Sequence, residues 1–227
     1  MMLHVPNVLS KTQVAQIREA MQQNDQWISG SKTAGHQATK IKNNLQIDAN
    51  SDLYKDLNTF IFQAIQSNLL IQSFALPKKI LPPMFNCYQD GGHYGNHVDN
   101  AVQWSKLDQT AIRTDVSITI FLSEPDEYEG GELIVEDCYG SHEVKLDAGD
   151  AIVYPATSLH RVEPVTKGVR IASFTWMQSM VKDDWQRSML FNLDMTIMSL
   201  KQKIGDCEEV LNLTNHYHNL LRQWGDV

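Results

Sequence analysis

The spacing of apolar residues changes twice along this chain and divides it into three parts. In residues 1–78 the apolar positions recur every three or four residues, which is the period of an amphipathic helix. One predicted helix begins after Ser10, which stands three residues before Gln13 as in a capping box. A second helix has a continuous apolar face made of Leu53, Leu57, Phe60, Ile61, Ala64 and Ile65. We therefore expect residues 1–78 to form an N-terminal helical segment that packs on the core.

In residues 79–178 apolar and polar positions alternate over short segments instead. The clearest predicted strand is Asp115–Leu122, whose apolar face includes Val116 and Ile118, and whose other face carries Ser117, Thr119 and Phe121. Further strands are predicted at Leu133–Val135, Glu143–Leu146, Ala151–Tyr154 and Arg170–Met177. Short strands without intervening helices predict an antiparallel barrel of two sheets, such as a jelly roll.

The helical period returns in residues 179–227. A first apolar face is formed by Trp185, Met189, Leu193, Ile197, Leu200 and Ile204, and a second, after the break at Gly205-Asp206, by Leu213, Tyr217, Leu221 and Trp224. This pattern predicts a helical hairpin that packs on the barrel or on another subunit, as in a homo-oligomer. A helical front, a β core and a helical tail make the fold class α+β.

The composition excludes some classes of protein. The net charge of −8 argues against a general nucleic-acid binder or a binder of anionic membranes, because both partners require a basic surface. The start of the chain lacks the pattern of a secretory signal, and no apolar stretch of about 18 residues predicts a spanning helix. Three widely separated cysteines indicate neither a disulfide framework nor a zinc ribbon. We therefore expect a cytoplasmic protein.

A candidate metal site is formed by His97, Asp99 and His160. Residues two apart on an extended chain point to the same side, so His97 and Asp99 present one imidazole and one carboxylate together. His160 follows a predicted strand, and a barrel brings residues that are distant in sequence together across its interior. Two histidines and one carboxylate form the facial triad that leaves coordination positions open on iron(II).

A candidate anion site is Arg170, ten positions beyond His160 on the last apolar strand. It shares one strand face with Ala172, Phe174 and Trp176, so its charge needs a partner. A guanidinium binds a carboxylate through two parallel hydrogen bonds, which suits a dicarboxylic cosubstrate. A protein carboxylate or solvent are the alternative partners.

The ordered set of motifs in residues 79–178 resembles the Fe(II)/2-oxoglutarate-dependent dioxygenase superfamily. The marks of this resemblance are Tyr88, His97-Val98-Asp99, Gly130-Gly131-Glu132-Leu133, Gly149-Asp150, His160 and Arg170. The chain is similar to the prolyl-4-hydroxylase branch and, with its helical flanks, most similar to the bacterial PKHD-type hydroxylases. The resemblance implies a double-stranded β-helix core, a requirement for iron(II) and 2-oxoglutarate, and L-ascorbate as a further cofactor.

The resemblance also implies roles for individual residues. Tyr88 and Trp176 are expected in the cosubstrate pocket. Phe121 departs from the family, because some prolyl-hydroxylase-like members place a tyrosine there near the cosubstrate, and this chain lacks that hydroxyl. The bacterial group is linked to iron homeostasis.

Three functions are compatible with these residues. The best supported is a dioxygenase that hydroxylates an unidentified substrate and releases succinate and carbon dioxide. A second is a non-catalytic module that binds iron or a 2-oxo acid and acts as a sensor. A third is a zinc hydrolase, since zinc also accepts His and Asp ligands. The substrate, whether a protein side chain, an amino acid or a small metabolite, depends on rim loops such as Ala101–Thr110.

Overall fold

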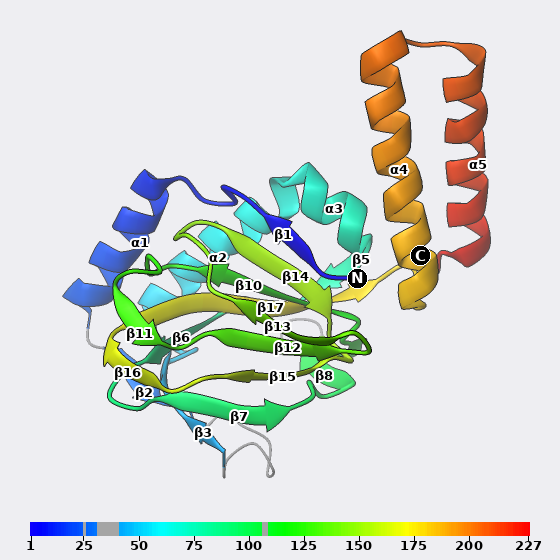
Figure 1. Ribbon diagram of the computed structural model, residues 1–227. Helices are drawn as coiled ribbons and strands as arrows, with labels where there is room; N and C mark the ends of the chain where they lie inside the picture. The colour runs from blue at the N-terminus through cyan, green and yellow to red at the C-terminus, as the bar shows by residue number, and fades with distance from the viewer. Residues whose placement is uncertain (25, 31–40, 106–108) are drawn as a thin grey trace.

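The computed structural model describes residues 1–24, 26–30, 41–105 and 109–227, and shows the predicted jelly roll with helices on one side (Figure 1). Part of the rim loop at residues 101–110 lies outside the described residues. Its described flanks are the paired strands β8 (Val102–Ser105) and β9 (Thr110–Arg113). In the described part of the chain, no helix combines the length and the apolarity that crossing a bilayer requires.

Two antiparallel sheets form the core. The larger has the strand order β1 (Leu3–Val5), β14 (Ala151–Pro155), β10 (Val116–Phe121), β17 (Arg170–Ser179), β6 (Met84–Tyr88), β4 (Leu45–Ile47) and β2 (Trp27–Ser29), and β5 (Pro77–Ile80) also pairs with β17. The smaller has the order β13 (Gly140–Val144), β12 (Leu133–Asp137), β15 (Leu159–Val162), β7 (His93–His97) and β3 (Lys42–Asn43). Strands β11 (Tyr128–Gly130) and β16 (Val165–Gly168) form a separate pair.

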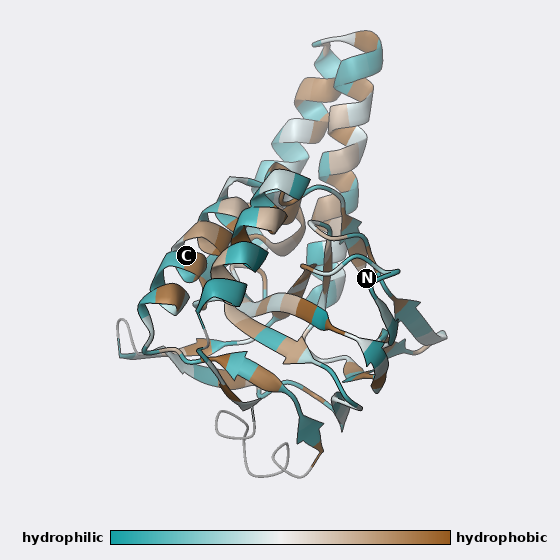
Figure 2. Ribbon diagram, turned by 90° about the vertical axis from the view of Figure 1, so that its left-hand side faces the viewer, coloured by the Kyte–Doolittle hydropathy of each residue, from teal (hydrophilic) through white to brown (hydrophobic). Residues whose placement is uncertain are grey.

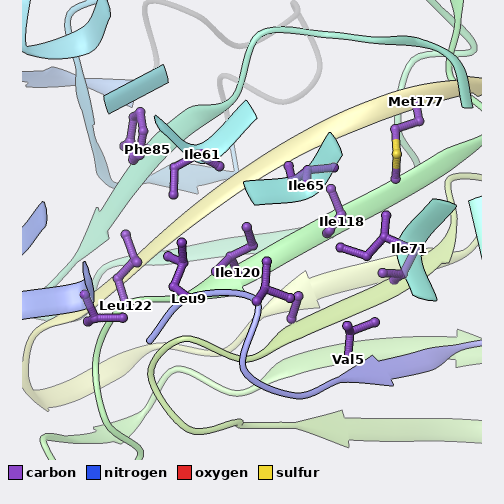
Figure 3. Packing of buried hydrophobic residues seen from close by; sticks show 14 of the residues in the cluster. Val5, Leu9, Ile61, Ile65, Ile71, Phe85, Ile118, Ile120, Leu122 and Met177 are labelled. Atoms are coloured by element: carbon purple, nitrogen blue, oxygen red, sulfur yellow. The ribbon is translucent and has the colours of Figure 1, made fainter. Parts of the chain in front are cut away.

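Apolar and polar side chains alternate along β10, and the two sets lie on opposite faces of the strand as the sequence predicted. Val116, Ile118 and Ile120 belong to the main hydrophobic cluster beneath the helices (Figure 3). Ser117 and Thr119 instead line a cavity on the opposite face. The larger sheet therefore separates an apolar core from a polar interior, and the site lies in that interior.

The helices α1 (Lys11–Gln23), α2 (Asp52–Ser67) and α3 (Leu69–Ala75) supply the other side of this core. Helix α1 has the predicted capping box between Ser10 and Gln13. Only helices were predicted before residue 78, whereas the structure has the strands β1 to β4 there as well. β1, β3 and β4 pair with core strands, and β2 pairs with β4. Strands of two or three residues are too short to produce an alternating pattern.

The tail forms the predicted hairpin of α4 (Asp184–Ile204) and α5 (Glu208–Trp224), which projects from the body (Figures 1 and 2). The hairpin packs on α3 at its base, where Leu190 joins Leu76 and Val181 in a small cluster. The apolar face expected for the first helix is not continuously buried. Ile197 is buried, but Trp185 is 74% exposed because it lies on the opposite side from Leu190.

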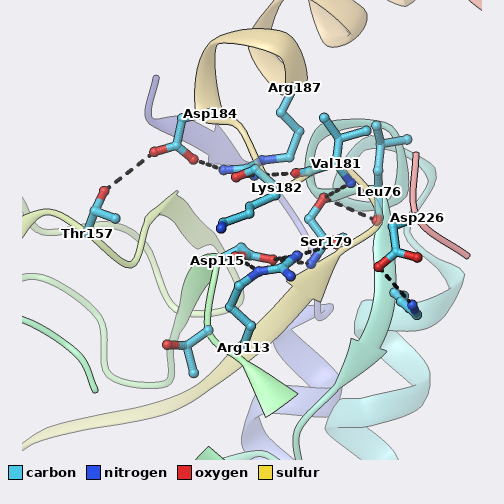
Figure 4. Close-up of polar contacts among 12 residues, drawn as sticks. Leu76, Arg113, Asp115, Thr157, Ser179, Val181, Lys182, Asp184, Arg187 and Asp226 are labelled. Atoms are coloured by element: carbon cyan, nitrogen blue, oxygen red, sulfur yellow. Dashed lines mark hydrogen bonds and ion pairs between the residues drawn. The ribbon is translucent and has the colours of Figure 1, made fainter. Parts of the chain in front are cut away.

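Polar contacts fix the base of the hairpin (Figure 4). Arg187 is buried, donates to the carbonyl oxygen of Val181 at 2.8 Å and pairs with Asp184. Nearby, Arg113 pairs with Asp115 at 2.6 Å. The buried charges in this region are thus satisfied by the protein itself.

Candidate metal centre and cosubstrate pocket

A cavity of about 580 Å³ lies between the two sheets. Its wall contains His97, Asp99 and His160 together with Arg170 and Trp176, so residues separated by up to about eighty positions share one interior. Tyr88 lines the same space. All six site residues that the sequence predicted are therefore gathered around a single cavity.

Pairing between strands β7 and β15 brings the two histidines together. His97 ends β7, and its backbone is in register with His160 of β15. The two imidazole centroids lie 4.2 Å apart, and His160 Nε2 lies 3.8 Å from an oxygen of Asp99. One ligand atom from each of the three residues lies within 4.8 Å of the others, as a shared metal ion requires.

Backbone carbonyls orient both imidazoles. His97 Nδ1 lies 2.8 Å from the carbonyl oxygen of Gly95, and His160 Nδ1 lies 3.0 Å from that of Ser158. A carbonyl oxygen only accepts, so each Nδ1 carries the proton and each Nε2 keeps a free lone pair. This is the arrangement that orients a histidine for metal binding.

Asp99 is held in a similar way by Ser117 of β10, whose hydroxyl donates to one carboxylate oxygen at 2.5 Å. The other oxygen lies toward His160. The hydrogen bond fixes the carboxylate in one orientation and leaves one oxygen as the ligand. The alternating pattern of β10 had placed Ser117 on this face, although the sequence analysis gave it no role.

Burial keeps His97 in the neutral form. The pKa of His97 falls to about 4, first because the ring is buried and second because His160 is close by. A neutral imidazole is the form that binds a metal, so no proton has to be displaced near neutral pH. The donor set therefore fits a divalent ion such as iron(II), whose preferred ligands include two imidazoles and one carboxylate.

Arg170 lies at the other end of the cavity, and its guanidinium lacks a hydrogen-bond partner at Nε. It is 2% exposed, and its guanidinium carbon lies 5.3 Å from the ring centroids of Tyr88 and Phe121. Its Nε has no hydrogen-bond partner, and no carboxylate among the described residues forms an ion pair with it. A buried cation without a counter-ion is costly, so the position suits the carboxylate of a ligand.

Tyr88 and Trp176 mark the two ends of this pocket. Tyr88 lies opposite Arg170 in the sheet, and burial raises the pKa of its phenol to about 12, so the hydroxyl stays neutral. Trp176 lies six residues beyond Arg170, about 20 Å along the strand, and is in register with Ser117. Trp176 therefore lies at the metal end of the cavity and Tyr88 at the Arg170 end.

Tyr94 is a site residue that the sequence analysis missed. Its ring stacks on His97 with centroids 3.6 Å apart. Three residues of β7 span the same distance as two of β15, so a β-bulge between Tyr94 and His97 brings both side chains to one face. Strict alternation would have placed them on opposite faces. His93, four residues before His97, bonds to the Gly91 carbonyl and does not line the cavity.

Comparison with known proteins assigns the family. Residues 83–178 match the 2OG-Fe(II) oxygenase superfamily, and residues 184–226 match the PKHD-type hydroxylase C-terminal domain. A PKHD-type hydroxylase of Hyphomonas neptunium is 55% identical over the full length of both chains, and the PKHD-type hydroxylase YbiX of Escherichia coli is 50% identical over the same extent.

Solved structures show the same fold at lower identity. A Pseudomonas putida prolyl-4-hydroxylase matches 78% of this chain and 92% of its own, with a TM-score of 0.53 and 19% identity. A Trichoplax adhaerens prolyl hydroxylase, crystallised with a hypoxia inducible factor peptide fragment, matches 83% of this chain and 86% of its own, with a TM-score of 0.54 and 14% identity. These structures show the fold, whereas the full-length relatives and the two family models show that the chain belongs to the PKHD-type hydroxylases of the 2OG-Fe(II) oxygenase superfamily.

Proposed function

We propose that this protein hydroxylates a substrate with dioxygen while converting 2-oxoglutarate to succinate and carbon dioxide. One oxygen atom would enter the substrate and the other would enter succinate. The observation that carries the proposal is a single cavity with three metal-ligand side chains at one end and an unpaired buried arginine at the other. A dicarboxylic 2-oxo acid is a ligand whose two ends match these two places.

Each residue of the site has a separable role. His97, Asp99 and His160 would hold iron(II), which when bound supplies the activation of dioxygen. Arg170 would bind the distal carboxylate of the cosubstrate, and Tyr88 would narrow the pocket beside it. Ser117 and the Gly95 and Ser158 carbonyls would keep the ligands in one geometry. The enclosing sheets would exclude bulk water from the reacting groups.

The aromatic residues near the metal end would shape the space for the primary substrate. Tyr154 packs edge-on against His160, with ring centroids 5.4 Å apart, and Tyr94 stacks on His97. Trp176 lies on the facing sheet. L-ascorbate would act as a reductant that maintains iron(II), and a role in iron homeostasis is a proposal that rests on the family resemblance.

Iron-dependent turnover tests the proposal. Wild-type protein with iron(II), 2-oxoglutarate and dioxygen should form succinate, and fractions of a bacterial lysate that contain the substrate should increase the rate. Mass spectrometry of those fractions should find a product heavier by one oxygen atom, which His160→Ala protein does not form. Anaerobic binding of iron and 2-oxoglutarate without substrate-dependent succinate would instead favour the non-catalytic sensor. Activity with zinc and no need for 2-oxoglutarate would favour the hydrolase.

A further inference from the structure

A second cation, Lys42, lines the cavity near its metal end. Lys42 is on the edge strand β3, paired with Tyr94 of β7. Its Nζ lies 5.1 Å from the centroid of the Tyr94 ring, and that ring stacks on His97. Arg170, by contrast, projects from the facing sheet near the opposite end of the cavity. The two cations thus reach one cavity from different sheets, and the metal ligands lie close to the lysine.

Lys42 has no counter-ion among the described residues. Within the described residues, ion pairs are formed by Lys11, Lys55, Lys78, Lys145, Lys167 and Lys201. The described cavity wall contains one acidic residue, Asp99. One of its oxygens accepts a hydrogen bond from Ser117, and the other faces the position that a metal would take beside His160. Of the residues outside the described part, 31–40 contain no Asp or Glu in their sequence, whereas positions 25 and 108 are aspartates.

The free protein gains little from placing an ammonium group at this position. The contact with Tyr94 is a cation–π interaction, which typically contributes about 0.5–2 kcal/mol. Burial disfavours the charged form and lowers the pKa of Lys42 to about 8. A neutral side chain of similar length would fit the same place at lower cost. The lysine is therefore explained better by a ligand than by the fold.

The charge balance of the cavity indicates the sign of that ligand, if the proposed function holds. Iron(II) contributes two positive charges and Arg170 one, whereas Asp99 contributes one negative charge and 2-oxoglutarate two. These charges cancel, and the two imidazoles are neutral. Among the described groups, Lys42 then leaves one uncompensated positive charge beside the metal end, where the primary substrate has to lie.

We propose that Lys42 binds a carboxylate of the primary substrate, which is accordingly a monoanionic molecule or a chain end rather than a neutral side chain. Among the described residues of the cavity wall, Lys42 is a single ammonium with no arginine fork or helix N-terminus beside it, which suits one singly charged group better than a phosphate dianion. The carboxylate would lie over Tyr94 and orient the rest of the substrate toward the metal. This proposal rests on the proposed function and specifies its substrate class.

Paired probes test the charge directly. N-acetyl amino acids and the corresponding N-acetyl amino acid amides differ in the carboxylate alone. Each pair is titrated calorimetrically into anaerobic protein loaded with iron(II) and 2-oxoglutarate. In wild type, at least one acid should bind tenfold or more tightly than its amide, and Lys42→Gln should abolish that difference. Lys167→Gln, which removes an exposed charge elsewhere, should retain it.

Further readouts separate the outcomes. Lys42→Gln should keep the affinities for iron(II) and 2-oxoglutarate, followed by the metal-to-ligand charge-transfer band, and its thermal unfolding midpoint should rise because an unpaired charge is removed. If the acids and amides bind wild type equally, or neither binds, the proposal is wrong. Loss of 2-oxoglutarate affinity with an unchanged acid preference would assign Lys42 to the cosubstrate. Absence of the band in wild type would contradict the proposed function itself.

Discussion

Two buried arginines show how differently two regions of this molecule treat charge. Arg187, at the base of the C-terminal hairpin, pairs with Asp184 and donates to the Val181 carbonyl. Arg170, in the cavity wall, is buried to a similar degree, yet its Nε has no partner among the described residues. Arg187, which holds the hairpin base, has its partners within the protein. Arg170, which faces the cavity, keeps its Nε without a described partner. The difference separates structural positions from binding positions without reference to sequence similarity.

The metal ligands should give the largest effect on function. Replacing His97, Asp99 or His160 singly by alanine removes one of three ligands, and we expect loss of stoichiometric iron and of turnover in each case. Anaerobic iron titration followed by metal analysis measures the loss. His93→Ala is the matched control, because this histidine lies nearby in sequence but outside the cavity wall. Wild-type iron stoichiometry in His160→Ala protein would show that the triad is assigned wrongly.

Arg187 should behave as a structural charge. Arg187→Met removes the ion pair between buried Arg187 and partly exposed Asp184 and leaves the Val181 carbonyl without its donor, and we expect the free energy of unfolding to fall by about 1–3 kcal/mol. Denaturant unfolding measures this change. The affinity for 2-oxoglutarate at low temperature, where the variant remains folded, should stay within about twofold of wild type. A variant as stable as wild type would place Arg187 outside the contacts that hold the hairpin base.

Arg170 should behave in the opposite way. Arg170→Ala loses charged hydrogen bonds worth about 1.5–3 kcal/mol, so the dissociation constant of 2-oxoglutarate should rise about tenfold or more while iron stays bound. Arg170→Lys keeps the charge but loses the planar fork, and its affinity should fall between the two. The charge-transfer band under anaerobic conditions measures both constants. Equal affinities in wild type and Arg170→Ala would remove Arg170 from the cosubstrate pocket.

Much of the candidate site could be predicted from the sequence, because it depends on the alternation of side chains along single strands. The alternation in β10 assigned Ser117 and Ile118 to opposite faces, and the spacing of His97, Asp99 and His160 indicated their convergence. The position of Tyr94 beside His97 could not be predicted, because a β-bulge breaks the alternation of side chains along β7.

Other features depend on tertiary packing. Lys42 lies on a strand of two residues that exists because β7 offers an edge for pairing, so no local pattern marks it. The exposure of Trp185 has a similar origin. The helical period places apolar residues on a face, but contact with α3 decides which part of that face is buried at the hairpin base.

The smallest expected effect is the contribution of Lys42 to the free energy of unfolding. The sign of this contribution distinguishes a binding charge from a structural charge. The pKa of Lys42 in the folded protein is lowered to about 8 by burial, whereas the ordinary value is 10.5. Between these two values the unfolded chain binds more protons than the folded chain, so stability rises with pH across that window. Below pH 8 the full cost of the buried charge is present.

Lys42→Met should therefore stabilise the ligand-free protein at pH 7. The lowering of the pKa corresponds to at most about 3 kcal/mol. We expect about 1–2 kcal/mol because the side chain is only partly buried and solvent screens its charge. The gain over wild type should shrink as the pH rises from 8 to 10, which denaturant unfolding at several pH values measures. Lys167→Met should show no such trend, because Lys167 is exposed and paired with Glu129. A loss of stability in Lys42→Met at pH 7 would make Lys42 a structural charge like Arg187 rather than a binding charge like Arg170.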